Sequence, residues 1–126
     1  MIGCKRIYLP ATAEDGYRVL VDRLWPRGCS KASLRLDGWL RELAPSAALR
    51  QSFAHDPGRF AEFRSAYRAE LAARRQLWQP LLEQAQRSNL TLLYAARDEQ
   101  HNNARVLAEF LDEQLAAVAR AAGPSR

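Results

Sequence analysis

The sequence predicts an α/β fold: a single small domain in which a short, mostly parallel sheet is flanked by helices in a Rossmann-like three-layer arrangement. The 126-residue chain is 48% hydrophobic, enough for one core without disulfides or metal. The apolar run at residues 90–96 is typical of a central parallel strand, and stretches of helical period lie on both sides of it. We expect one domain over residues 1–122 and a flexible C-terminal tail at 123–126.

Two β-rich runs begin the chain, at residues 6–9 and 18–21. The second contains three consecutive β-formers at 19–21, which is typical of a strand covered on both faces. The connection between the runs, with a turn at 13–16, is too short for a standard helical crossover. Either the two strands are antiparallel or an irregular loop joins them, and the sequence leaves both open.

Helical periodicity follows residue 28. A first helix is predicted from the i, i+3, i+4, i+7 spacing of Leu36, Trp39, Leu40 and Leu43, and it ends at Pro45.

Four later helices are also expected. Ser46 is a cap for a short helix, and Asp56-Pro57 is a start signal for a longer one. A further helix is predicted at 79–87, with Pro80 in its first turn, and a last helix follows the central strand. Their inward residues are expected to be Leu49, Phe53, Phe60, Phe63, Tyr67, Leu71, Trp78, Leu81, Leu82, Ala85, Leu107, Phe110, Leu111, Leu115 and Val118.

Composition narrows the classes of partner. The formal charge of +5 permits attraction to nucleic acid, acidic lipid or a phosphorylated metabolite, but the basic residues are spread along the chain. No apolar stretch is long enough to cross a bilayer, so no membrane association is expected. The two cysteines, Cys4 and Cys29, fit a reducing cytoplasm and lack the spacing of a zinc site, so we expect a cytoplasmic protein without metal.

Polar side chains follow two of the predicted strands, at residues 22–28 and 97–102. Ligands of open α/β sheets bind beyond the carboxyl ends of the strands. Arg23 and Arg27 are candidates to clamp a phosphate or carboxylate, and Gly28 would let the backbone approach the ligand. Alternatively, Arg23 pairs with Asp22 or Asp98. Trp25 is either a packing anchor or a platform on which a base stacks.

The candidate catalytic residues are Asp98 and His101. Asp98 is the first carboxylate after the central strand, where it would accept a proton or cap the last helix. The start of that helix and a neighbouring arginine favour a neutral His101, which suits a general base. Asn102 directs its amide to a ligand or caps the helix. His55 stays a candidate because only its neighbour is explained by the helix start.

Four segments carry a family resemblance: the GYRVLVDRLWPRG run at 16–28, LAPS at 43–46, HDP at 55–57, and LLYAARD at 92–98 with HN at 101–102. With them the chain closely resembles the YeaO-like branch of an uncharacterised bacterial family, domain-of-unknown-function family 488, over about residues 5–111. The resemblance implies an α/β fold and a set of family residues, but no settled activity. These residues are Asp22, Arg23, Trp25, Arg27, His55, Tyr94, Asp98, His101 and Asn102.

Three functions follow from these features. The first is a protein, enzyme or sensor, that binds a small anionic ligand such as phosphate or a nucleotide in a polar pocket of Arg, Asp and His side chains. The second is a nucleic-acid-binding or regulatory module with a basic surface. The third is a protein-interaction module with an exposed aromatic patch. No Walker, GxGxxG or GxSxG motif identifies a cofactor or a reaction, and the oligomeric state is unknown. The first function predicts a concave pocket between the two polar loops, whereas the second predicts no deep pocket.

Overall fold

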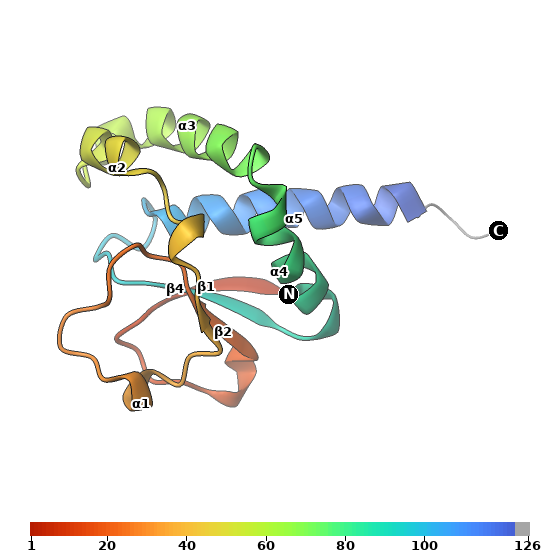
Figure 1. Ribbon diagram of the computed structural model, residues 1–126, viewed down its shortest axis with the longest axis horizontal. Helices are drawn as coiled ribbons and strands as arrows, with labels where there is room; N and C mark the ends of the chain where they lie inside the picture. The colour runs from red at the N-terminus through yellow and green to blue at the C-terminus, as the bar shows by residue number, and fades with distance from the viewer. Residues whose placement is uncertain (123–126) are drawn as a thin grey trace.

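The computed structural model describes residues 1–122 and confirms the α/β class (Figure 1). Its sheet has the order β1-β4-β2-β3, and all of its pairings are parallel. The strands are β1 (Ile2–Arg6), β2 (Tyr17–Leu20), β3 (Gly38–Trp39) and β4 (Leu90–Tyr94). Because all strands run in the same direction, their carboxyl ends meet at one edge. The tail predicted at 123–126 lies outside the described residues.

The helices are unequally divided between the two faces of the sheet. They are α1 (Lys31–Leu34), α2 (Ala47–Phe53), α3 (Phe60–Ala72), α4 (Arg75–Arg87) and α5 (Asn103–Ala122). Helices α2 to α5 pack on one face around the larger core, and the other face is covered by the short α1 and the loops beside it (Figure 1). The third layer is therefore thin. No helix in the described part of the chain has the length and apolar character of a membrane span.

Strand β4 lies at the centre of the sheet, as its apolar sequence predicts. All five of its residues are buried, and they pair with β1 on one side and β2 on the other. Leu90, Leu92 and Tyr94 contribute to the larger core, while Leu93 packs in the smaller core on the opposite face. The continuous apolar run therefore results from burial on both faces.

The first strand was predicted at residues 6–9, which is wrong. Strand β1 ends at Arg6, because residues 2–6 pair one by one with β4 and the chain then turns at Leu9, whose N–H donates to the Arg6 carbonyl. Strands β1 and β2 are not neighbours, since β4 lies between them and parallel to both. Of the two open alternatives, the antiparallel pair is wrong, and an irregular loop with a short 3-10 turn (Ala13–Asp15) joins the strands.

The helix predicted from Leu36 to Leu43 is also wrong. This segment forms β3 and a 3-10 turn (Arg41–Leu43), because it adds to the sheet beside β2. The N–H groups of residues 37 and 40 donate to the carbonyls of residues 18 and 20, at 2.7 and 2.9 Å. Its apolar side chains separate accordingly: Leu36 and Trp39 pack on the smaller core, and Leu40 and Leu43 on the larger one.

The predicted capping signals are confirmed. The Ser46 hydroxyl accepts a hydrogen bond from the Leu49 N–H at 3.3 Å at the start of α2, and the Asp56 carboxylate accepts one from the Gly58 N–H at 2.9 Å. Pro57 begins a 3-10 turn (Pro57–Arg59) that leads directly into α3.

Two expectations for the later helices are wrong. Helix α4 begins at Arg75, before the predicted residue 79, so Pro80 lies in its interior. The indole of Trp78 donates to the Leu71 carbonyl at 2.7 Å and fixes this earlier start against the end of α3. Val118 is 40% exposed, because the last turns of α5 extend beyond the rest of the domain (Figure 1).

A buried charged cluster lies beneath the smaller core, where the sequence predicts only an apolar strand. Arg18 of β2 is 5% exposed; it forms an ion pair with Asp15 and donates to the Leu34 carbonyl at 2.8 Å. Asp15 also pairs with Lys5 at 3.1 Å and accepts from the Thr12 N–H. Burial alone would raise the pKa of Asp15, but the hydrogen bonds from Thr12, Lys5 and Arg18 outweigh it and lower the pKa to about 2.

Candidate functional site

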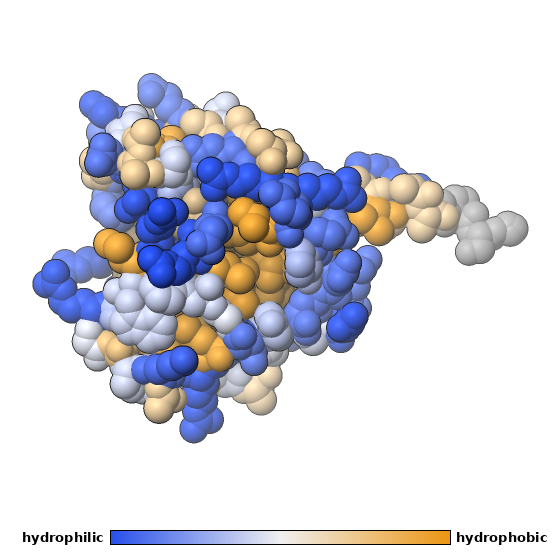
Figure 2. All heavy atoms as spheres, viewed as in Figure 1, coloured by the Kyte–Doolittle hydropathy of each residue, from blue (hydrophilic) through white to orange (hydrophobic). Residues whose placement is uncertain are grey.

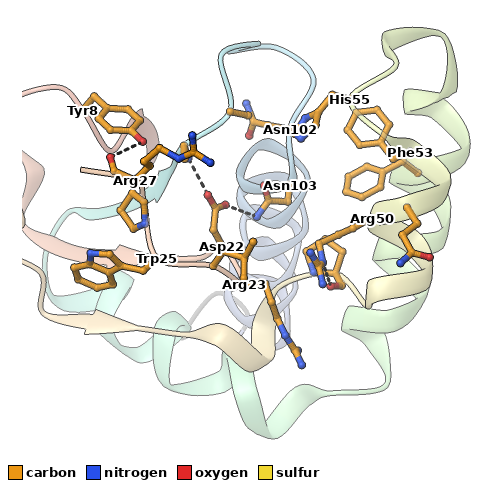
Figure 3. Close-up of a pocket in the computed structure, with 17 residues that line it drawn as sticks. Tyr8, Asp22, Arg23, Trp25, Arg27, Arg50, Phe53, His55, Asn102 and Asn103 are labelled. Atoms are coloured by element: carbon orange, nitrogen blue, oxygen red, sulfur yellow. Dashed lines mark hydrogen bonds between the residues drawn. The ribbon is translucent and has the colours of Figure 1, made fainter. Parts of the chain in front are cut away.

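A cavity of about 560 Å³ opens at the carboxyl edge of the sheet (Figure 3). Segments that follow all four strands contribute to its wall, together with α2, α3 and the start of α5. This is the position at which open α/β sheets hold ligands. The two polar loops singled out in the sequence, at 22–28 and 97–102, therefore lie at one edge. The N–H of Ala95, directly after β4, donates to the Asp22 carboxylate of the first loop at 2.9 Å.

The cavity brings together six of the ten candidate site residues: Asp22, Arg23, Trp25, Arg27, His55 and Asn102. The remaining four, Gly28, Tyr94, Asp98 and His101, do not line it. Four further polar residues of the wall were not predicted: Tyr8, Arg50, Gln51 and Asn103. Arg50, Gln51 and Asn103 are on helices α2 and α5, whereas the predictions rest on the loops that follow strands. The paired asparagines at 102 and 103 were the available signal for Asn103, while no pattern in the sequence marks Arg50.

Asp22 forms the polar base of the cavity (Figure 3). One carboxylate oxygen accepts from the Ala95 N–H, and the other accepts from the Asn103 amide at 3.2 Å. That amide also donates to the Val21 carbonyl at 2.9 Å, so the start of α5 is tied to the end of β2. Burial raises the pKa of Asp22, and the hydrogen bonds from Ala95 and Asn103 and the charge of His55 offset this only in part.

Three arginines, Arg23, Arg27 and Arg50, are among the residues that line the cavity. In Figure 3 the side chain of Arg27 extends toward Asp22 and Asn102, whereas that of Arg23 extends away from them. Within residues 1–122, no hydrogen bond or ion pair holds the side chain of Arg23 or Arg27. The alternative in which Arg23 pairs with Asp22 or Asp98 is therefore wrong. Arg50 donates to the Pro45 carbonyl at 3.3 Å.

Aromatic residues contribute to the apolar part of the wall. Phe53 and Phe63 stack with their centroids 4.5 Å apart, and both line the cavity. Trp25 packs edge-on against Trp39 at 5.3 Å, and its indole N–H donates to the Cys29 carbonyl at 2.8 Å. Trp25 is therefore a packing anchor that also belongs to the wall of the cavity.

His55 reaches the cavity from the turn after α2. Ala54 and His55 both have left-handed backbone, with φ of 48° and 56°, which is uncommon for residues other than glycine. The His55 ring lies 6.1 Å from the ring of Phe53, between centroids. The turn thus places an imidazole beside the aromatic wall and close enough to Asp22 to influence its pKa.

Asp98 and His101 form a pair outside the cavity. The Asp98 carboxylate accepts from the N–H groups of Gln100 and His101 at 2.9 and 3.0 Å and lies 2.9 Å from Nδ1 of His101. The Gln100 N–H, and then the His101 side chain, lower the pKa of Asp98. The His101 ring packs edge-on against Phe60 at 5.0 Å. These contacts shape the loop before α5, and a catalytic role for the pair stays a prediction.

The other candidates have local structural roles. Asn102 caps α5, because its side-chain oxygen accepts from the Arg105 N–H at 3.0 Å. Gly28 has a φ of 79°, so it serves the turn, and a Cβ there would meet no atom within 4 Å. Tyr94 is buried in the larger core, and burial raises its pKa. Among residues 1–122, no three His, Cys, Asp or Glu side chains are grouped so that they could hold a metal ion.

A second groove, of about 300 Å³, lies between α4 and the β3 edge of the sheet. Tyr17, Leu40, Leu77 and Leu81 are among its apolar residues. Figure 2 shows an apolar area with hydrophilic surroundings on this face of the molecule, near the position of α4 in Figure 1. The groove has fewer charged residues than the cavity and shares no lining residue with it.

Comparisons with known proteins agree with the resemblance found in the sequence. Residues 1–126 match the family model DUF488-N3i, described as the inactive DUF488-N3 subclade. The chain is 49% identical over 110 residues to uncharacterized protein YeaO of Escherichia coli, covering 87% of this chain and 96% of that protein. It is 40% identical over 107 residues to uncharacterized protein Rv3073c of Mycobacterium tuberculosis, covering 85% and 90% respectively. No solved structure matches the chain significantly.

Proposed function

The chain belongs to the DUF488-N3i family. We propose that it binds a small anionic ligand, such as phosphate or a nucleotide, in the cavity at the carboxyl edge of the sheet. In this proposal the protein binds the ligand but does not catalyse a reaction on it. One observation carries the proposal: three arginines and a single carboxylate line the same cavity, and no partner among the described residues holds the side chains of Arg23 and Arg27. Guanidinium groups recognise phosphate and carboxylate through paired donors in one plane.

Charge and shape both support this ligand class. The three arginines exceed the one carboxylate in charge, so the cavity attracts anions. A volume of about 560 Å³ with an aromatic wall suits a small organic molecule. The nucleic-acid hypothesis predicted no deep pocket, and the cavity therefore favours a small ligand over a nucleic-acid strand.

The placement of the acid and base candidates supports binding without catalysis. A general base must reach the proton that it removes, and neither Asp98 nor His101 lines the cavity. Within the cavity, both oxygens of Asp22 already accept hydrogen bonds that tie β2 to β4 and α5. The description of the family as inactive agrees with this arrangement.

Thermal unfolding with added ligand tests the proposal. Phosphate or adenosine 5′-monophosphate, at about 100 times its dissociation constant, should stabilise the protein by roughly 2.7 kcal/mol, which is several degrees in Tm. Arg27→Ala should abolish the shift and barely change the Tm of the free protein, because an exposed arginine without partners contributes little to folding.

Arg120→Ala is the matched control, since it removes the same charge from an exposed position near the end of α5. This variant should keep the full shift. If Arg27→Ala also keeps it, or if no anion shifts the Tm of the native protein, the cavity is not an anion site.

A further inference from the structure

The proposed anion site does not explain why a carboxylate, that of Asp22, lies in its wall. We infer that Asp22 is a specificity-determining residue, which selects ligands whose anionic group is joined through a ring to an N–H or O–H donor, as in a nucleoside monophosphate. This inference rests on the proposed function, because it assigns the second recognition group of the same cavity. The arginines would hold the anionic end of the ligand, and Asp22 would accept from the other end.

The hydrogen bonds of Asp22 leave room for such a donor. An ionised carboxylate has about four acceptor positions. Two of them are used, one on each oxygen, by the Ala95 N–H and the Asn103 amide. Both donors are neutral, and no ion pair joins Asp22 to a Lys, Arg or His in the part of the chain that the structure describes. The carboxylate therefore lies at a cavity wall with acceptor positions unused.

Burial of the Asp22 carboxylate gives its unused acceptor positions a role in ligand binding. A carboxylate removed from water is unfavourable unless hydrogen bonds or a cation compensate it. Burial raises the pKa of Asp22 despite its two hydrogen bonds, so compensation in the free protein is incomplete. A donor group on a ligand would supply the missing compensation, and a ligand without one would cover the carboxylate and leave it unpaired.

The space between the charged groups has an apolar wall. Phe53 and Phe63 stack on one side of the cavity, and the Arg27 side chain extends from the loop opposite (Figure 3). A flat or apolar ring fits against the stacked phenyl groups. The cavity thus combines three kinds of surface: a cationic rim, an aromatic wall and an acceptor at the base.

Asp22 also ties the two loops together, and the test must separate this structural role from specificity. Calorimetric titration with small phosphates does so, using phenyl phosphate as the probe without a ring donor. The probes with donors are 3-aminophenyl phosphate, 4-aminophenyl phosphate and adenosine 5′-monophosphate. The native protein should bind at least one of these three about ten to a hundredfold more tightly than phenyl phosphate, the range expected for a hydrogen bond to a charged acceptor.

Two variants complete the design. Asp22→Asn should reduce the preference for a donor to less than threefold, while the affinity for phenyl phosphate should be kept or increased, because the unpaired negative charge is gone. Asn103→Ala loosens the same tie but keeps the carboxylate, so the preference should remain. Equal loss of affinity for all phosphates in both variants would show that Asp22 only holds the loops, and would overturn the inference.

The two proposals fail differently. A preference below threefold in the native protein overturns the inference about Asp22 even if Asp22→Asn does not fold, and it leaves the anion site intact when phenyl phosphate still binds through Arg27. Failure of every phosphate to bind, or binding that survives Arg27→Ala, overturns the proposed function and the inference with it.

Discussion

Removal of the Asp15 carboxylate should destabilise the fold by about 3–5 kcal/mol, because it leaves a buried arginine without its counter-ion. Arg18 is 5% exposed, and within residues 1–122 the Leu34 carbonyl is the only partner of its guanidinium apart from Asp15. Asp15→Ala also removes the ion pair with Lys5 and the hydrogen bond from the Thr12 N–H. The expected loss is therefore a large fraction of the stability of a domain of this size.

Urea unfolding of Asp15→Ala, followed by circular dichroism, measures the loss. Glu113→Ala is the control, because it removes the carboxylate of an exposed ion pair with Arg68 and should cost less than about 1 kcal/mol. Equal small effects of the two variants, each below about 1 kcal/mol, would refute the claim that the Asp15 pair is a buried structural element.

The same pair predicts a pH dependence. The pKa of Asp15 is lowered from 3.8 to about 2 in the folded state, so the stabilisation is fully present above pH 3.8 and is lost as the pH falls through about 2. This lowering of the Asp15 pKa on folding corresponds to roughly 2 kcal/mol in the free energy of unfolding. The difference in stability between the native protein and Asp15→Ala should therefore narrow between about pH 4 and pH 2. A constant difference over this interval would contradict the lowered pKa.

Two further predictions concern the larger core and the cysteines. Phe63→Ala should cost about 3–5 kcal/mol in urea unfolding, since Phe63 is buried and stacks on Phe53; a negligible change in the midpoint would contradict this packing. A thiol reagent at pH 8 should modify Cys29 in the native protein and reach Cys4 only on unfolding, because burial raises the pKa of Cys4 to about 11 and its thiol donates to the Ala104 carbonyl. Equal rates for the two thiols would show that Cys4 is accessible.

The sequence predicts best those elements whose pattern has a single physical cause. Strand β4 was found because burial on both faces requires a continuous apolar run. Helices α2 and α3 were found because Ser46 and Asp56 satisfy N–H groups that a helix start leaves free.

Strand β3 was missed because its apolar spacing has two explanations. Residues 36, 39, 40 and 43 fit one side of a helix, yet in the structure they divide between the two cores. What decides the conformation is the pairing of the backbone with β2, a contact that is distant in sequence and invisible to a local pattern. Strand β1 was placed too late for a similar reason, since pairing with β4 sets its limits and its own composition does not.

The site was partly predictable for the same reason as the sheet. The rule that ligands bind beyond the carboxyl ends of strands led to Arg23 and Arg27. His55 was a candidate because the helix start explains only its neighbour, and the family resemblance added Asp22. Neither the rule nor the resemblance could predict Arg50, because the position of α2 over the sheet edge depends on tertiary packing.

Titration of the ¹⁵N-labelled protein with phosphate and adenosine 5′-monophosphate, followed by NMR, tests the central claim most directly. Ligand binding in the cavity should shift the indole N–H of Trp25 and the backbone N–H groups of residues 22–25, 27, 95 and 96, which line it. The indole of Trp78, which is buried among helices, should stay unchanged. Shifts confined to the groove beside α4, around Leu77 and Leu81, or the absence of any shift at millimolar ligand, would contradict the claim that this cavity is the binding site.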